Sequence, residues 1–166
     1  MTKAVWSGVF TALAVLVFSS QASAQATASG TVTVSASVNA KAKLTLGSGS
    51  VTFNDADPDV TPLLTATGAV SVDVKARTSS AANVTLTVQS GGDLTSGSDT
   101  IGISNLTWTA TGTNFVAGTM GTTAVSLGSW TGGGSVAGTQ TYRLVNSWNY
   151  TTGTYTATIT YTLTAP

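Results

Sequence analysis

The chain has 166 residues, and 7% of them are charged, against about 25% in an average globular protein. It contains no cysteine and no histidine, which excludes disulfides, thiolate and imidazole metal sites, and the commonest nucleophilic and acid–base catalytic groups. The formal net charge is +0, and so few scattered cations do not make the basic surface that nucleic-acid binding requires.

Residues 1–24 are predicted to be a secretory signal peptide. Lys3 provides the positive start, residues 4–18 the apolar stretch, and Ala22-Ser23-Ala24 the small residues of a cleavage site. The apolar stretch is shorter than the roughly 20 residues that a membrane-spanning helix needs, so we expect no membrane span after cleavage. An uncleaved anchor is the alternative. We expect residues 25–166 to form a single domain that is exported through a periplasm and is secreted or held at the cell surface.

Threonine, valine, serine and glycine dominate the rest of the chain, as is typical of strands and turns. Period-two alternation of apolar and polar residues predicts about eight strands. The first is an alternating N-terminal strand over residues 28–38. Further strands are predicted, in chain order, at 43–46, 50–53, 70–76, 84–88, 101–110, 125–130, 139–145 and 155–163.

Two connections in this series carry specific expectations. The strands at 70–76 and 84–88 are separated by a short polar break, which predicts a hairpin. The alternation within residues 101–110 changes phase near Ser104-Asn105, as a β-bulge would cause.

Short strands at this spacing, with no helical periodicity between them, predict an all-β fold. We expect an antiparallel two-sheet β-sandwich of the immunoglobulin-like kind, with a β-barrel as the alternative. Each sheet would bury its valines, leucines and aromatic residues and expose its threonines. Trp108, Trp130 and Trp148 are then expected to pack in the core or at its rim.

Three carboxylates lie within a short segment, at Asp55, Asp57 and Asp59. Oxygen ligands grouped in this way suit calcium, so these residues are a candidate metal site. The alternative is a polar turn in which the aspartates cap their own backbone. These acids lie on one predicted turn, and the sequence indicates no second acid opposite them, so glycoside hydrolysis is not expected. We expect no enzymatic activity.

Trp130, Trp148 and Tyr150 lie near glycine-rich or polar turns and are candidate glycan contacts, because exposed rings stack on the apolar faces of sugars. The alternative is that they close the ends of the sandwich.

The predicted strands at the two ends of the mature chain are candidates for subunit interaction. An extended terminal strand can complete the sheet of another subunit through main-chain hydrogen bonds, with alternate side chains in pockets, and such a contact repeated head to tail builds a filament. The alternative is that both strands pair within their own domain. The apolar positions of the two strands are Val32, Val34, Ala36, Val38, Tyr155, Ala157, Ile159, Tyr161 and Leu163.

The signal peptide, the two alternating terminal strands and the Thr-, Ser- and Gly-rich middle resemble fimbrial subunits of the chaperone-usher kind and the related spore coat U-type domains. The resemblance implies that a periplasmic chaperone holds the strand at 155–163, and that residues 28–38 insert into the next subunit of a homopolymer. Those domains often carry a disulfide, which this chain lacks.

A narrower resemblance joins residues 155–166 to the closing segment of WxL cell-wall-binding domains. Those domains have tryptophan where this chain has Tyr161, and residues 106–110 match their second Trp-x-Leu motif only in part. This resemblance implies the alternative function of a monomeric module that binds a cell-wall polymer or another glycan. The first hypothesis is an exported structural or adhesive surface protein, assembled as a fimbrial or pilus subunit.

Overall fold

The computed structural model describes residues 26–166, so the predicted signal peptide lies outside the described residues. The chain divides into one unit that ends at Ala36 and a second that spans Ser37–Pro166. Residues 26–40 form no strand, and all their side chains are exposed. The strand predicted over residues 28–38 is therefore wrong for the single chain. Alternation alone does not make a strand, because a ladder partner must supply the hydrogen bonds.

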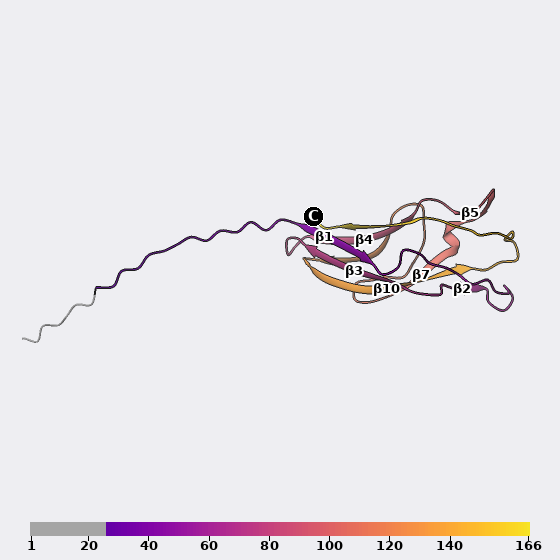
Figure 1. Ribbon diagram of the computed structural model, residues 1–166, viewed down its shortest axis with the longest axis horizontal. Helices are drawn as coiled ribbons and strands as arrows, with labels where there is room; N and C mark the ends of the chain where they lie inside the picture. Colours follow the sequence, from indigo (N-terminus) through magenta and orange to yellow (C-terminus); the bar gives the residue numbers. More distant parts are fainter. Residues whose placement is uncertain (1–25) are drawn as a thin grey trace, which may run out of the picture. The chain divides into compact units, whose positions relative to one another are not determined.

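The second unit contains eleven strands, and the described residues include no α-helix (Figure 1). The strands are β1 (Lys41–Leu46), β2 (Leu63–Thr65), β3 (Val70–Arg77), β4 (Asn83–Ser90), β5 (Leu94–Ser96), β6 (Asp99–Ile101), β7 (Leu106–Thr111), β8 (Gly118–Thr119), β9 (Val125–Thr131), β10 (Gly134–Val145) and β11 (Ile159–Thr164). A single 3-10 turn, Ile103–Asn105, precedes β7.

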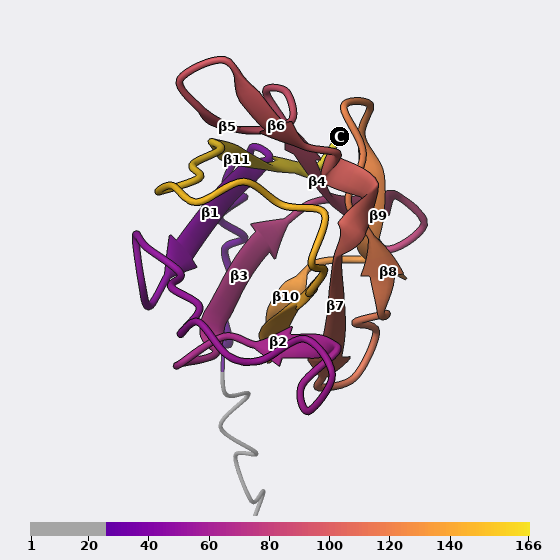
Figure 2. The same ribbon diagram turned by 90° about the vertical axis from the view of Figure 1, so that its right-hand side faces the viewer.

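Two antiparallel sheets and a small hairpin organise these strands (Figure 2). The first sheet has the order β1-β3-β10-β7-β8, and β2 adds to the far end of β10. The second sheet has the order β11-β4-β9, and β5 pairs with β6 in the hairpin. The predicted all-β class and antiparallel two-sheet sandwich are confirmed.

The core lies between the inner faces of the two sheets. Val72 and Val74 of the first sheet and Leu86 and Val88 of the second are fully buried, and they belong to one cluster. Every second residue of β3 and β4 is buried, because alternate side chains of a strand point to opposite faces. Trp108 is buried at this interface, as predicted for a core tryptophan, and its indole nitrogen donates to the Val116 carbonyl.

The indole of Trp108 packs directly over Gly118 in β8. A Cβ atom at that position would collide with the six-membered ring of the indole. A glycine is therefore required where β8 passes Trp108.

Backbone contacts join the two sheets along one side of the sandwich. The Val116 amide, in the link between β7 and β8, donates to the Leu127 carbonyl of β9 at 2.9 Å, and Phe115 forms a bridge with Gly128. Along the other side, β1 pairs only with β3 and β11 only with β4, as far as residues 26–166 are concerned. The first sheet and the second thus each end in a strand with one unpaired edge on that side.

Several boundaries differ from the sequence-based expectation. The hairpin predicted from 70–76 and 84–88 is wrong, because β3 lies in the first sheet and β4 in the second. Each strand buries one face. The alternating pattern is therefore the same whether the two strands pack face to face across the core or pair side by side in one sheet. Residues 50–53 form no strand. The phase change near residue 104 marks the 3-10 turn between β6 and β7 instead of a bulge.

Truncation of one buried leucine tests the core. Leu86→Ala is expected to lower the free energy of unfolding by about 2–5 kcal/mol, because Leu86 is fully buried and its neighbours cannot collapse into the space. Leu63→Ala is the matched control, since that leucine is 40% exposed on β2. Its effect should stay within about 1 kcal/mol. Equal losses in urea titrations of the two variants would contradict this placement of the core.

Candidate functional site

An apolar groove opens on the side of the sandwich where β1 and β11 have free edges. Its volume is about 1110 Å³, and both sheets, the β5–β6 hairpin, and the loops at residues 48–58 and 146–158 contribute to its lining. We call it the inter-sheet groove. Its main apolar lining comprises Phe53, Leu64, Leu94, Leu106, Tyr142 and Ile159.

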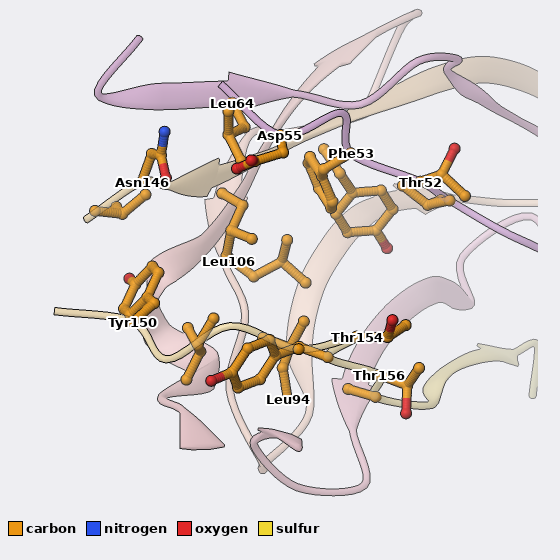
Figure 3. A pocket seen from close by; sticks show the side chains of 18 of the residues that line it. Thr52, Phe53, Asp55, Leu64, Leu94, Leu106, Asn146, Tyr150, Thr154 and Thr156 are labelled. Atoms are coloured by element: carbon orange, nitrogen blue, oxygen red, sulfur yellow. The ribbon is translucent and has the colours of Figure 1, made fainter. Parts of the chain in front are cut away.

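The walls of the groove are core side chains that the strands leave accessible. Figure 3 shows Phe53 and Leu64 on one wall and Leu94 on the opposite one, with Leu106 between them. Leu64 comes from β2 and Leu106 from β7, whereas Phe53 comes from the loop after β1. The groove therefore reaches into the hydrophobic core instead of lying on a polar surface.

A polar cluster spans the two sheets beside the groove. The Tyr142 and Tyr161 hydroxyls are 2.8 Å apart, and the Tyr161 hydroxyl donates to Oε1 of Gln140 at 2.5 Å. Gln140 and Tyr142 lie on β10, and Tyr161 lies on β11. Gln140 is fully buried, and its Nε2 has no hydrogen-bond partner among the described residues. This cluster holds the open edge strand β11 against the first sheet.

Burial keeps these hydroxyls protonated. It raises the pKa of Tyr142 well above its usual value, and the neighbouring Tyr161 adds to that rise. Burial also raises the pKa of Tyr161, although the hydrogen bond with Tyr142 partly offsets the rise. Burial also raises the pKa of Tyr150 at the rim of the groove. A neutral phenol is favoured at each position, so none of them acts as a base near neutral pH.

The C-terminal candidates fall into two groups. Ile159, Tyr161 and Leu163 of β11 are half-buried and face the core, as the alternation predicted. The strand predicted over residues 155–163 is too long, because residues 157 and 158 lie outside any strand and Thr156 forms only a bridge to Thr95. Ala157 is exposed and does not face inward as predicted. Tyr155 is half-buried and lines the groove.

The N-terminal candidates are all exposed. Val32 and Val34 are each 88% exposed and Val38 is 70% exposed, and Ala36 is also exposed. These values are high for valine, which is one of the residues most often buried. The alternating pattern is therefore present in the described chain without the burial that such a pattern normally accompanies.

The acidic segment forms a turn. The Asp59 amide donates to Oδ1 of Asp57 at 2.9 Å, which is an Asx turn, and all three aspartates are exposed. Among residues 26–166, no three acidic side chains are grouped so that they could hold a metal ion. The arrangement of Asp55, Asp57 and Asp59 therefore matches the polar-turn alternative and lends no support to the calcium hypothesis.

The three candidate glycan contacts differ in how far their rings are exposed. Trp148 is 68% exposed, and its indole nitrogen donates to Oδ1 of Asp59 at 3.1 Å. Trp130 packs against the core and its indole nitrogen is buried, so it is a poor glycan contact. Tyr150 is half-buried and lines the groove. Of the three, only Trp148 presents its ring to solvent.

Sequence reasoning missed most of the groove. Leu64, Leu94 and Leu106 have the same pattern signal as core residues, and only the assembled sheets show that they line an opening. The sequence contained one weak indication of the polar cluster at Gln140, Tyr142 and Tyr161. Gln140 is a polar residue at an inward-facing position of β10.

Searches with protein-family models and of curated proteins found no match to this chain. Within residues 26–166, no helix has the length and apolar character required to cross a membrane.

The tyrosine cluster generates a prediction about pH. The folded-state pKa values of Tyr142 and Tyr161 lie above the unfolded value of 10.0, so their contribution to stability is complete below that pH. It should be lost as the pH rises above about 10, because only the unfolded chain then releases these protons readily. Chemical denaturation across this range should show the unfolding free energy falling in the parent.

Two variants isolate the cluster. The Tyr142→Phe, Tyr161→Phe double variant should show a smaller fall above that pH. Tyr161→Phe alone should cost about 1–3 kcal/mol at neutral pH, because it leaves Oε1 of buried Gln140 without a donor. An identical alkaline fall in the parent and the double variant would show that the two phenols are not the titrating groups.

Proposed function

We propose that this chain is an exported structural or adhesive surface protein whose copies assemble by β-strand addition, as in a fimbrial or pilus-type polymer. In this proposal residues 28–38 of one copy occupy the inter-sheet groove of the next copy. The supporting observation is that one chain contains two complementary features. One is an exposed segment with alternating apolar residues, and the other is an apolar groove on the side where two strands have free edges.

The chemistry of the two parts is complementary. Free edges of β1 and β11 present unpaired backbone groups, which an incoming strand can satisfy. An inserted segment would direct Val32, Val34 and the next alternate residues into the groove and its threonines and serines to water. Burial of each valine side chain contributes roughly 1.5–3 kcal/mol. Before assembly, the exposed groove would need cover from a periplasmic chaperone, since open apolar edges invite aggregation.

A paired substitution tests the alternating fit. Val34→Asp should reduce polymer formation at least tenfold, because it would place a charge in the apolar groove without a partner. Thr33→Asp is the matched control: it adds the same charge one residue away, on the face directed to water. Size-exclusion chromatography and negative-stain microscopy of the mature protein measure polymer length. Equal effects of the two variants would contradict inward insertion of the valine face.

Deletion of residues 28–38 tests the role of the segment as a whole. The deleted protein should still fold, because the segment forms no strand and the second unit begins after it. It should not polymerise. A synthetic peptide of residues 26–40 should bind it and raise its melting temperature. Unfolding of the deleted protein, with no rescue by the peptide or a chaperone, would show instead that the segment belongs to its own domain.

The exposed ring of Trp148 favours a second candidate, a monomeric module that binds a cell-wall polymer or another glycan. Its indole nitrogen donates to Asp59, and its largely exposed ring is available to stack on the apolar face of a sugar. Retention on insoluble polysaccharide tests this candidate. Trp148→Ala should abolish retention, while Trp130→Phe should leave it unchanged because that ring packs against the core. Retention that survives Trp148→Ala would exclude this residue as the contact.

A further inference from the structure

Most of the cations of the folded unit lie on one small patch. Lys41 pairs directly with Arg77, and Lys43 pairs directly with Lys75, in the ladder between β1 and β3. All four side chains are exposed on the outer face of the first sheet. We call these four residues the basic patch. The only carboxylate in the next row is Asp73, which pairs with Thr45.

The basic patch is unfavourable for an isolated subunit. Like charges directly opposite each other on a sheet are destabilising, and here two such pairs are adjacent. Arg77 is partly engaged, since its Nε donates to the Asn39 carbonyl at 2.8 Å, whereas the three lysines are exposed to solvent where an anion can reach them. The basic patch lowers the stability of the isolated subunit and concentrates positive charge. Such an arrangement indicates a negatively charged partner.

Negative charge gathers at the opposite end of the same unit. Lys75 pairs across to Ser135 near the start of β10, whereas the acidic turn is tied to the residues that follow Val145 at its end. Asn146 donates to the carbonyls of Ala56 and Thr61, and Trp148 donates to Asp59. Ten residues of strand separate Ser135 from Val145, which corresponds to about 33 Å. Figure 1 shows the start of β1 and the end of β10 at opposite ends of this unit.

The acidic turn also lies at the groove. Asp55 and Asp57 line the inter-sheet groove together with the apolar residues. In the chain, Lys41 follows Val38 by three residues, a span of about 10 Å in an extended strand. A copy that inserts residues 28–38 into a groove therefore brings its own basic patch close to the mouth of that groove.

We infer that the basic patch of one copy docks on the acidic turn at Asp55, Asp57 and Asp59 of the next, so that charge sets the direction and rate of head-to-tail assembly. This inference rests on the proposed function, because the inserted segment is what brings the two surfaces together. Insertion must then place Val38 towards Ile159 and the acidic turn, and Val32 towards Tyr161, so that the inserted strand runs antiparallel to β11.

Neutralisation of either surface tests the contact. Lys41→Gln, Lys43→Gln, Lys75→Gln removes three cations, and Asp55→Asn, Asp57→Asn, Asp59→Asn removes three anions while keeping the oxygens that accept hydrogen bonds. Light scattering of the mature protein should show assembly about tenfold slower at low salt for each triple variant, with most of the salt dependence lost. Unchanged rates for both variants would overturn the inference.

Charge reversal provides the stricter test. Lys41→Glu, Lys43→Glu, Lys75→Glu should block assembly at low salt. A second variant, Asp55→Lys with Asp57→Asn and Asp59→Asn, should be impaired less strongly. Combining both sets in one chain should restore a measurable part of the rate, which a purely structural effect of either set could not do. Failure of the combined variant, with each parent set folded, would contradict a direct contact between the two surfaces.

The peptide separates this inference from the proposed function. Residues 26–40 carry no charged side chain, so the peptide should bind the deleted protein equally well with either neutralised surface and at any salt concentration. Peptide binding with charge-independent assembly overturns only the charged contact, whereas absence of peptide binding overturns strand addition itself. Retention on heparin or anionic vesicles that depends on the lysines, with no effect of the aspartates, would overturn a second copy as the partner.

Discussion

In the part of the chain that the structure describes, the two sheets share one core but are joined by backbone contacts along only one side. At the joined side, the Val116 amide reaches Leu127 in the opposite sheet and Phe115 bridges to Gly128. At the other side, β1 and β11 end their sheets with unpaired edges, and the apolar interior opens as the inter-sheet groove. The proposed strand addition depends on this asymmetry, since a sandwich joined along both sides would offer no free edge for an incoming strand.

The tyrosine cluster explains how the open side keeps its shape. Tyr161 connects β11 to Gln140 and Tyr142 of the first sheet, and three hydrogen-bonding groups on two sheets define the spacing of the edge. Polar contacts in such a place are more specific in direction than apolar packing, because a hydrogen bond fails when its geometry shifts. The cluster thus fixes the position of β11 relative to the first sheet beside the groove.

Much of the fold could be predicted from the sequence, because alternate burial is a local property. Alternating apolar residues predict β3, at Val70, Val72 and Val74, and β4, at Val84, Leu86 and Val88. The pattern does not say which strands are neighbours, so the hairpin expected between β3 and β4 was wrong. It also does not say whether an alternating segment finds a partner. Residues 28–38 have as clear a pattern as β3 and form no strand in the described chain.

The site was less predictable, because residues from seven or more segments meet there only after folding. In the sequence, its apolar lining cannot be distinguished from core residues.

The pairing of β1 with β3 has a consequence for the mechanical strength of the protein. It begins at Lys41 and pairs antiparallel with β3 over six residues, from Lys41 with Arg77 to Leu46 with Val72. Tension applied to the chain ahead of Lys41 pulls along the axis of this strand. All of the ladder hydrogen bonds then bear load together in shear instead of breaking one after another, so β1 is arranged as a mechanical clamp.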